Sequence, residues 1–362
     1  MRIPWKWLTL AVPVTLLLAC SEQPTAPKPE AAVLPVASAS LHAAAPTVTV
    51  QDLGTLGGVN SSARAINDEG WVVGVSDLAQ PGASHAFLWK HGKMTDLGTL
   101  GGTSSTAMGI NDEGEVVGTS QIAGDAVSHA FLWSHGRMRD LGGLGGSYAE
   151  GFDINDAGDV AGGGMTPTGV FHAALWRHGW VKDLGTLGGD YSWSNGIGDR
   201  DVVVGGAQLP LDTAWHAFIW KNGVMHDIGT LGGSSAGVSH INHAGAMAGG
   251  SLLADNATEH AFLWERGRWH DLGTLGSAYN YSYAQWINNR GQVAGGSCPP
   301  DWSCHATLWD HGVTTDLGLL PGGLTWSWAQ AVNDHGQVAG GALTAAGAEH
   351  AALWTVREHD RR

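Results

Sequence analysis

The chain has 362 residues, of which only 14% are charged, and its formal net charge at pH 7 is −15. This acidic balance argues against nucleic-acid phosphates as a partner. No stretch after residue 20 is apolar enough to span a bilayer, and the 55 glycines recur at fixed offsets, which indicates turns and close packing and not low complexity.

The first 19 residues have the layout of a secretory signal, with Arg2 and Lys6 ahead of an apolar run over residues 7–19. That run is too short for a comfortable transmembrane helix. It ends in Leu-Leu-Ala-Cys, which resembles a bacterial lipobox and implies a lipid-modified Cys20 as the new N-terminus. Because Ser21 and not Asp follows, the resemblance implies the outer membrane in a two-membrane bacterium. The alternative is an ordinary signal peptide cut nearby, with Cys20 incidental.

The segment after Cys20 is rich in Pro, Ala and Ser and has no period, which is typical of a flexible tether. We therefore expect four parts along the chain. These are a signal peptide over 1–19, the lipidated Cys20 with its tether over 20–46, a folded domain over 47–356 and a charged tail over 357–362.

Two motifs recur along the rest of the chain, with successive copies 43 to 45 residues apart. One reads His-Ala-x-Leu-Trp or a close variant and begins at His85, His129, His172, His216, His260, His305 and His350. The other reads Asp-(Leu/Ile)-Gly and begins at Asp52, Asp96, Asp140, Asp183, Asp227, Asp271 and Asp316. An Ile-Asn-Asp-x-Gly-like element, as in residues 66–70, lies between them. This self-similarity indicates one repeat array and not two ordinary domains.

Each repeat contains four short segments with the character of β-strands. In the first full copy they are Ser61–Asn67, Trp71–Asp77, His85–Lys90 and Lys93–Thr99. Residues 67–70 have the composition of a turn between the first and second strands. His91-Gly92 fits a two-residue hairpin between the third and fourth strands, since Gly adopts a positive φ. Other copies replace this His by Asn222 or Arg266, so we interpret it as a surface residue.

The third strand of each repeat is apolar on both faces, because Phe87 and Trp89 point to one side while Ala86 and Leu88 point to the other. Such a strand lies between two sheets. About 44 residues in four strands, repeated with both faces buried, are typical of propeller blades. The sequence predicts an all-β protein, a seven-bladed β-propeller with four strands in each blade.

The two ends of the array complement each other. The last repeat supplies three strands, ending at residues 350–354, whereas the Asp-Leu-Gly element in Thr47–Leu56 has no third strand before it. We predict that Thr47–Leu56 pairs with Glu349–Val356, completes the seventh blade and closes the ring without a free sheet edge. The alternative is an open β-solenoid, which needs capping ends.

The repeated His suggests a metal site, but the geometry of a propeller opposes one. With strands about 4.8 Å apart, the third strand lies roughly 15 Å from the axis, and equivalent residues are then on the order of 13 Å apart. Zinc needs ligands near ~2 Å. We expect instead that His85 and Asp96, diagonal neighbours on one sheet face, form a buried structural hydrogen bond in each blade. We expect no metal and no cofactor.

The combination of His-Ala-Phe, Leu-Trp and Asp-Leu-Gly-Thr-Leu-Gly-Gly resembles the HAF family of probable extracellular repeat proteins. The resemblance covers about residues 50–354, seven times over. It implies a location outside the cytoplasm, and it supplies no activity and no catalytic residue. The fourth repeat departs from the pattern over residues 197–201, where Asp201 takes the position of Gly. We expect a distorted turn there and not a lost blade.

The connections from one repeat to the next vary most, and the later copies carry extra aromatic residues there. These residues are Tyr148, Tyr191, Trp193, Tyr279, Tyr281, Tyr283, Trp286, Trp326 and Trp328. Clustered Trp and Tyr at the mouth of a ring suit a ligand-binding face. The alternative is that alternate residues turn inward and fill gaps between the inner strands.

The loops between the second and third strands add further polar and aromatic residues on the same rim. They are Asp125, Asp212, Trp215, Asp255 and the segment Cys298-Pro299-Pro300-Asp301-Trp302-Ser303-Cys304. In an exported protein Cys298 and Cys304 are expected to form a disulfide across the loop. A redox-active pair is the weaker reading, since the spacing is not Cys-x-x-Cys and no helix N-terminus is near.

The sequence contains no nucleophile elbow, P-loop, dinucleotide fingerprint or zinc spacing. The leading hypothesis is a surface-exposed, lipid-tethered, monomeric propeller whose aromatic rim binds a glycan, an extended peptide or another envelope protein. The second is a glycan-active hydrolase or lyase that uses carboxylates of the same rim, such as Glu150, Asp190 or Asp212. The third is a passive spacer or scaffold without a specific ligand.

Overall fold

The computed structural model describes residues 46–199 and 202–357. The expected signal peptide over 1–19, Cys20, most of the tether and residues 358–362 of the tail lie outside the described residues. The described chain folds into 28 β-strands and one short 3-10 turn, Pro210–Asp212. Within these ranges, no helix has the length and apolar character needed to cross a membrane.

The strands fall into four sets by their place in each four-stranded unit. The first, innermost strands are β2 (Gly57–Ile66), β6 (Gly101–Ile110), β10 (Ala149–Ile154), β14 (Ser192–Ile197), β18 (Ala236–Ile241), β22 (Tyr281–Ile287) and β26 (Ser327–Val332). The second strands are β3 (Val72–Leu78), β7 (Val116–Ile122), β11 (Val160–Met165), β15 (Val203–Gln208), β19 (Met247–Leu252), β23 (Val293–Cys298) and β27 (Gln337–Leu343). The third strands are β4 (Ser84–Lys90), β8 (Ser128–Ser134), β12 (Phe171–Arg177), β16 (Trp215–Lys221), β20 (Glu259–Glu265), β24 (His305–Asp310) and β28 (Glu349–Arg357). The fourth strands are β5 (Lys93–Asp96), β9 (Arg137–Gly142), β13 (Trp180–Asp183), β17 (Val224–Gly229), β21 (Arg268–Gly273), β25 (Val313–Asp316) and β1 (Thr47–Asp52).

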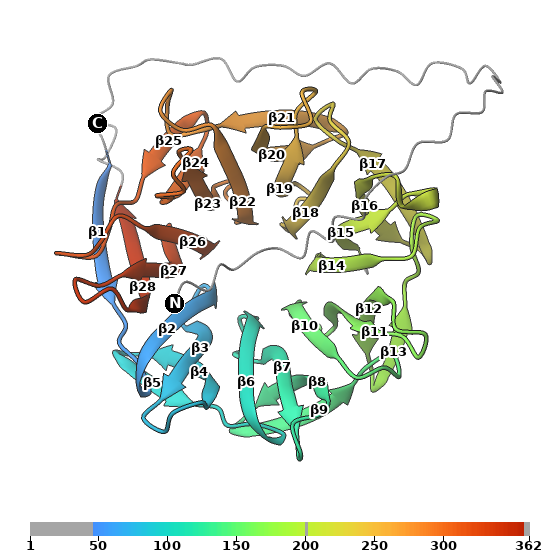
Figure 1. Ribbon diagram of the computed structural model, residues 1–362, viewed down its shortest axis with the longest axis horizontal. Coiled ribbons are helices and arrows are strands. Elements are labelled where there is room, and N and C mark those ends of the chain that lie inside the picture. Colours follow the sequence, from blue (N-terminus) through green and yellow to red (C-terminus); the bar gives the residue numbers. More distant parts are fainter. Residues whose placement is uncertain (1–45, 200–201, 358–362) are drawn as a thin grey trace. The chain divides into compact units, whose positions relative to one another are not determined.

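The strands form antiparallel sheets that stand around a common centre, which is the arrangement of a β-propeller (Figure 1). Units 3 to 6 are separate four-stranded sheets in chain order, beginning at β10, β14, β18 and β22. Units 1 and 2 begin at β2 and β6 and are linked into one eight-stranded sheet by a single bridge, Ser84 to Ser104. Unit 7 consists of β26, β27, β28 and β1.

The predicted hairpin between the third and fourth strands is confirmed. Lys90 pairs with Lys93, and the two turn residues His91 and Gly92 both have positive φ, at 51° and 78°. Trp89 faces Met94 and Phe87 faces Asp96. The fourth strand is shorter than expected, since pairing stops at Asp96 and not at Thr99.

The core lies between neighbouring units, as the apolar third strand requires. Phe87 is fully buried against residues of units 1 and 7, while Leu88 on the opposite face packs with Ile110 and Phe131 of unit 2. Burying each such side chain contributes about 1.5–3 kcal/mol relative to leaving it exposed. Each unit is therefore stabilised mainly by its two neighbours.

The N-terminal strand completes the last unit, as predicted. β1 pairs antiparallel with β28, and the register runs from Thr47 opposite Arg357 to Asp52 opposite Ala352. The His350 ring then contacts Asp52, 2.8 Å away across 298 positions of sequence. Pairing covers residues 47–52, because Leu56 belongs instead to an isolated bridge with Leu78.

The expected His–Asp pairs are present, but they are not buried. In unit 1 the His85 Nδ1 atom lies 2.8 and 2.9 Å from the two Asp96 carboxylate oxygens. The side chains are 18% and 42% exposed, because the short fourth strand leaves the outer face of the sheet open. Each pair therefore links two outer strands at the surface, where such a contact contributes roughly 0.2–1 kcal/mol.

The asparagine of each Ile-Asn-Asp turn links one unit to the next, which sequence reasoning had treated only as turn chemistry. Asn67 Nδ2 donates to the carbonyl of Asn111, and Asn333 Nδ2 donates to the carbonyl of Asn67. Unit 4 has Gly198 at this position and cannot donate through a side chain. Asn195, on its inner strand, donates to the Val238 carbonyl of unit 5 instead. The unit that departs from the repeat is thus retained, although residues 200–201 of its turn lie outside the described residues.

Candidate ligand-binding site

The antiparallel order gives the molecule two different rims. One carries the turns after the first and third strands of each unit, and we call it the turn rim. The other carries the connections after the second and fourth strands, and we call it the loop rim. Five of the eight exposed large apolar side chains in the described residues lie on the loop rim: Val59, Tyr191, Leu211, Trp302 and Leu324.

Aromatic pairs accompany these exposed side chains on the loop rim. The ring centroids of Trp193 and Trp215, from the first and third strands of unit 4, are 4.1 Å apart. In unit 7, Trp326 and Trp328 are 3.8 Å apart. In unit 6, the Tyr281 ring lies 5.2 Å from Trp302. The loop rim therefore presents aromatic surface in three units, all in the second half of the chain.

One member of each group is packed inward, against a glycine of the second strand. Trp193 pairs with Gly206, Tyr283 with Gly296 and Trp328 with Gly341. An ideal Cβ at Gly341 would lie 2.2 Å from the Trp328 ring, and Trp328 is only 6% exposed. The alternative of inward-turned aromatics thus holds in part, because each of these three rings packs on a glycine and beside a second aromatic ring, which is Trp215, Tyr281 or Trp326. The sequence feature that could have indicated this inward packing is the Gly-Gly doublet in the second strand, which units 1 and 2 lack.

Trp286 does not lie with the rim aromatics, and its expected place was wrong. Its ring stacks on His240, with centroids 3.6 Å apart and planes at 16°. Both line a cavity of about 110 Å³ together with Asp153 and the Asn-Asp turns, so they lie towards the turn rim. A β-bulge between Ala284 and Trp286 breaks the alternation of the strand and turns this side chain towards the axis.

Asp153 and His240 form a buried acid–base contact beside Trp286, with Oδ2 and Nε2 3.5 Å apart. Burial raises the pKa of Asp153 to about 7, although the backbone N–H groups of Ile197 and Ile154 donate to it. Burial lowers the pKa of His240 to about 3. A neutral His240 donates from Nδ1 to the Ile287 carbonyl 3.0 Å away, so this contact is not an ion pair at neutral pH.

Arg64, Glu150 and Glu349 are three further ionisable groups that are largely buried. Of these, sequence reasoning named only Glu150 as a candidate site residue. Arg64 is deeply buried, which lowers its pKa, while the charges of Glu349 and Glu150 oppose that shift. Burial raises the pKa of Glu150 to about 7, against the hydrogen bond from Tyr148 and the charge of Arg64. The Tyr148 hydroxyl donates to Glu150 Oε2 over 2.6 Å. A guanidinium therefore lies between carboxylates of units 3 and 7.

The remaining carboxylates proposed from the sequence serve other roles or lie apart. Asp125 accepts from the Thr103 backbone N–H at 2.8 Å, and Asp255 accepts from the backbone and hydroxyl of Thr258. Asp190 is exposed in the connection from β13 of unit 3 to β14 of unit 4, whereas Glu150 lies on β10. Asp212 belongs to the 3-10 turn before β16. The charged neighbour that acts on Glu150 is Arg64, which also feels the charge of Glu349.

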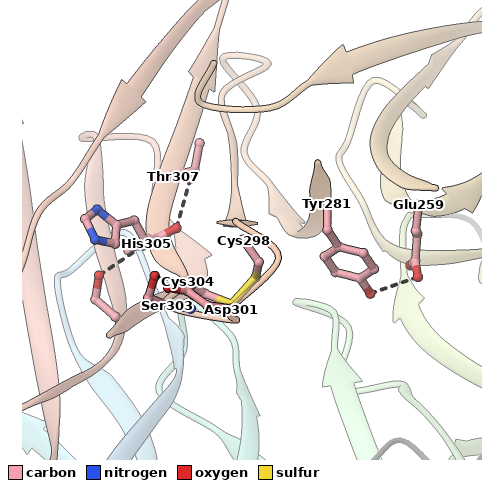
Figure 2. The surroundings of a disulfide bond; sticks show 10 residues. Glu259, Tyr281, Cys298, Asp301, Ser303, Cys304, His305 and Thr307 are labelled. Carbon is pink, nitrogen blue, oxygen red and sulfur yellow. Dashed lines mark hydrogen bonds between the residues drawn. A yellow bond between two sulfur atoms is a disulfide. The ribbon is translucent and has the colours of Figure 1, made fainter. Parts of the chain in front are cut away.

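The loop before β24 is closed by a disulfide between Cys298 and Cys304, with the sulfur atoms 2.04 Å apart (Figure 2). Both cysteines are buried. Beside this loop, Tyr281 donates its hydroxyl to Glu259 Oε2 over 2.8 Å. The rings of Tyr279 and His305 have centroids 6.1 Å apart and planes at 65°. Within residues 46–199 and 202–357, no group of three or more His, Cys, Asp or Glu residues could hold a metal ion.

The fold and its rims define a β-propeller with a candidate ligand surface on one face. No protein-family model matches the chain, and no curated protein matches it. Three solved structures are similar to it in chain path. TolB from Acinetobacter baumannii has a TM-score of 0.47 at 11% identity over 83% of this chain, and a putative TolB from Agrobacterium tumefaciens has 0.48 at 12% over 84%. A mutant Aleuria aurantia lectin in complex with Fucalpha1-6GlcNAc has 0.39 at 11% over 84%.

These similarities cover different shares of the other chains. The protein spans 65% of the length of the A. baumannii TolB, 100% of the A. tumefaciens protein and 96% of the lectin. The assignment of a β-propeller to this chain rests on its own strand pairing and on the arrangement of its sheets.

Proposed function

We propose that this chain is an exported, lipid-anchored binding protein that holds its ligand on the aromatic part of the loop rim. The observation that carries the proposal is the exposure of Trp302, Tyr191, Leu211 and Leu324 on one rim, next to the aromatic pairs of units 4, 6 and 7. Apolar side chains gathered on one face of a soluble domain mark a contact surface. Trp and Tyr combine large apolar area with a polar group, which suits a glycan or an extended peptide.

We define the rim aromatic surface as six residues of units 4, 6 and 7, each exposed or partly exposed on the loop rim: Tyr191, Trp193, Trp215, Tyr281, Trp302 and Trp326. Tyr283 supports it by packing on Gly296 at 6.1 Å from the Tyr281 ring, whereas Tyr148 lies on unit 3 and contacts Glu150. Trp328 supports Trp326, and Trp286 is left out because it lies towards the turn rim. The early units have small residues in place of these aromatics, so the ligand would cover units 4 to 7.

We also propose that the seven units form a closed ring held by β1. Support comes from the β1–β28 pairing and from the Asn333 to Asn67 hydrogen bond between the last and first units. A closed ring has no free sheet edge for aggregation, and a protein exposed at a cell surface benefits from that. The family resemblance to HAF repeats is consistent with such a location.

The export and anchoring part of the proposal rests on residues 1–20 alone. Cys20 would carry the lipid, and the tether would separate the propeller from the membrane. Mass spectrometry of the protein purified from a bacterial envelope should find an N-terminal lipidated Cys20. The change Cys20→Ala should release the protein into the soluble fraction. An intact N-terminus with Met1 would contradict the anchor without affecting the binding proposal.

Binding is tested with the purified full-length protein against glycans, peptides and envelope proteins. A ligand of the rim should lose affinity about tenfold or more with Trp193→Ala or Trp326→Ala, since interface Trp residues often cost 2 kcal/mol or more when truncated. Trp180→Ala is the matched control, because Trp180 is exposed on the turn rim. Equal loss in all three variants, or no effect in any, would sink the rim as the site, whereas a passive spacer predicts that no member of the panel binds.

A second candidate function, a glycan hydrolase or lyase, is favoured by one observation. The pKa of Glu150 is raised to about 7. Its carboxylate accepts a hydrogen bond from the Tyr148 hydroxyl and is attracted by the charge of Arg64. Such a group could exchange a proton with a substrate at pH 7. Product formation lost in Glu150→Gln but kept in Asp190→Asn would assign the activity to this group. If Glu150 acts as a base, the rate should rise as pH increases through about 7.

A further inference from the structure

The disulfide loop of unit 6 holds a large apolar side chain in solvent. Cys298 and Cys304 are buried at the ends of the loop, whereas Trp302 between them is 62% exposed. Closing a loop of seven residues removes much of the freedom of the unfolded chain, by roughly 2–3 kcal/mol in the chain-entropy model. The disulfide therefore constrains a segment that contributes little to the core. Its main effect is to fix the position of the loop that carries Trp302.

Trp302 has a backbone conformation that bulky residues rarely adopt. Its φ is 63°, in the left-handed region that favours glycine. Two hydrogen bonds fix this conformation, from Trp302 N to the Pro299 carbonyl and from Cys304 N to the Trp302 carbonyl, each at 2.9 Å. A constrained and unusual backbone around an exposed aromatic residue is typical of a functional position.

The indole is not isolated, because it forms a corner with fixed aromatic rings. Trp302 and Tyr281 are 5.2 Å apart with planes at 58°, and Tyr281 lies 6.1 Å from Tyr283. Tyr283 in turn is packed over Gly296. The Tyr281 hydroxyl is held by Glu259, from the third strand of unit 5 (Figure 2). A chain of contacts therefore runs from the inner strand to the exposed face of Trp302.

Two carboxylates lie beside this corner. Asp301 is exposed next to Trp302, and its Oδ1 accepts from Ser303 N and Oγ at 3.0 and 2.7 Å. Glu259 lies on the other side, half-buried, where it accepts from Tyr281. Carboxylates accept hydrogen bonds from hydroxyl groups and repel anions. An aromatic face flanked by such acceptors matches a ring with apolar C–H faces and hydroxyl edges.

We propose that the corner of Trp302 and Tyr281 is a subsite for a neutral sugar ring, and that the Cys298–Cys304 disulfide keeps the corner in its binding geometry. The ring would stack on the indole, while its hydroxyls donate to Asp301 and Glu259. Uronic sugars are disfavoured by both carboxylates and by the net charge of −15. This inference rests on the proposed function, since it names the ligand class and one subsite of the same rim.

The test uses the full-length protein with neutral cello-, xylo- and chito-oligosaccharides, and with oligogalacturonate as the acidic counterpart. Calorimetry should detect a neutral ligand that binds at least tenfold more tightly than the acidic one. Trp302→Ala should weaken that binding at least tenfold, and Trp180→Ala should not change it. Cys298→Ser/Cys304→Ser should weaken it by a smaller factor, because the loop then samples other conformations.

Trp302→Gly separates a binding role from a structural one. Glycine relieves the left-handed backbone, so the melting temperature should stay the same or rise while the sugar affinity falls at least tenfold. A fall in melting temperature with unchanged affinity would overturn the subsite. Loss of sugar binding in Trp193→Ala or Trp326→Ala but not in Trp302→Ala would overturn it as well, and would leave the proposed function standing. A ligand insensitive to every rim variant would instead overturn the proposed function.

Discussion

Asp153 and His240 occupy the same repeat position in two units, where the other units have Ala65, Gly109, Gly196, Trp286 or Ala331. The small residue Gly196 between them lets the two side chains meet across unit 4, since a Cβ there would lie 3.1 Å from the His240 Cα. A buried acid and a buried base that stay neutral together avoid the cost of a buried charge. This contact therefore makes the free energy of unfolding depend on pH in two opposite ways.

The two pH dependences have opposite signs. The pKa of Asp153 rises from 3.8 to about 7 on folding, so its contribution to stability is full below pH 3.8 and is lost as pH rises through 7. The pKa of His240 falls from 6.5 to about 3 on folding, so its contribution is full above pH 6.5 and is lost as pH falls towards 3. In the native protein the two slopes largely cancel between pH 3.8 and 6.5.

Single substitutions should uncover each slope. In His240→Gln, the free energy of unfolding should fall as pH rises from about 4 to 7, by a few kcal/mol at about 1.4 kcal/mol per pKa unit. In Asp153→Asn it should rise over about pH 3 to 6.5 by a similar amount. Urea denaturation at several pH values measures both, and each variant is the control of the other. Slopes of the same sign in both variants would show that the pair does not control the pH response.

At the scale of the strand, the first and second strands of every unit approach more closely than side chains allow. A Cβ on Gly74, for example, would lie 2.0 Å from the Ser62 carbonyl oxygen. The same contact, at 1.9 to 2.0 Å, recurs at the equivalent glycines: Gly118, Gly162, Gly205, Gly249, Gly295 and Gly340. The contact lies next to the β-bulge of the first strand, which brings its backbone over the glycine.

Two glycines that pack against each other in unit 5 test this requirement. Gly249→Ala should destabilise the protein by at least about 1–3 kcal/mol, because the backbone of β18 must move away. Gly237→Ala, on β18 itself, should be neutral or slightly stabilising, since its Cβ would meet only the Trp193 ring at 4.0 Å. Thermal denaturation of both variants makes the comparison. Equal destabilisation would mean that strand flexibility, and not close approach, selects glycine here.

The sequence predicted the elements well, because each is repeated and carries its own signals. The His91-Gly92 turn fixes the register, and the facing pairs Phe87–Asp96 and Trp89–Met94 follow from it. Simple alternation failed at Trp286, where an irregular step in the strand changes the direction of the side chain. It also missed the inter-unit hydrogen bonds of Asn67 and Asn195, because the repeated Asn indicates a turn but does not show which carbonyl its side chain reaches.

At the scale of the whole molecule, β1 is the only strand of unit 7 that comes from the other end of the chain. Its removal would leave β28 as an unpaired edge, with the outer side of Trp354 partly uncovered. Deletion of residues 47–52 should therefore lower the melting temperature by 10 °C or more, on the order of several kcal/mol in stability, and promote self-association. Deletion of residues 26–31, of equal length, is the control. A monomeric deletion variant of unchanged stability would contradict closure by β1.

The architecture was predictable from the chain, whereas the site was predictable only as a region. Aromatic residues that exceed the repeat pattern indicated the loop rim, and Tyr281 and Trp326 lie there. The depth of each side chain could not be predicted, because it depends on whether the facing strand offers a glycine, as Gly341 does for Trp328. Arg64 and Glu349 come from units 1 and 7, which are distant in sequence, so only the folded chain shows their coupling.

The direction in which β1 enters the last sheet sets how an anchored molecule would be oriented. Thr47 pairs with Arg357, at the end of β28 that lies on the turn rim, whereas Asp52 lies near the loop rim beside His350. A chain attached through residues before Thr47 is therefore pulled from the turn rim. If Cys20 carries the proposed lipid, the aromatic surface would lie on the rim opposite the point of attachment, where large polymers or neighbouring cells could reach it.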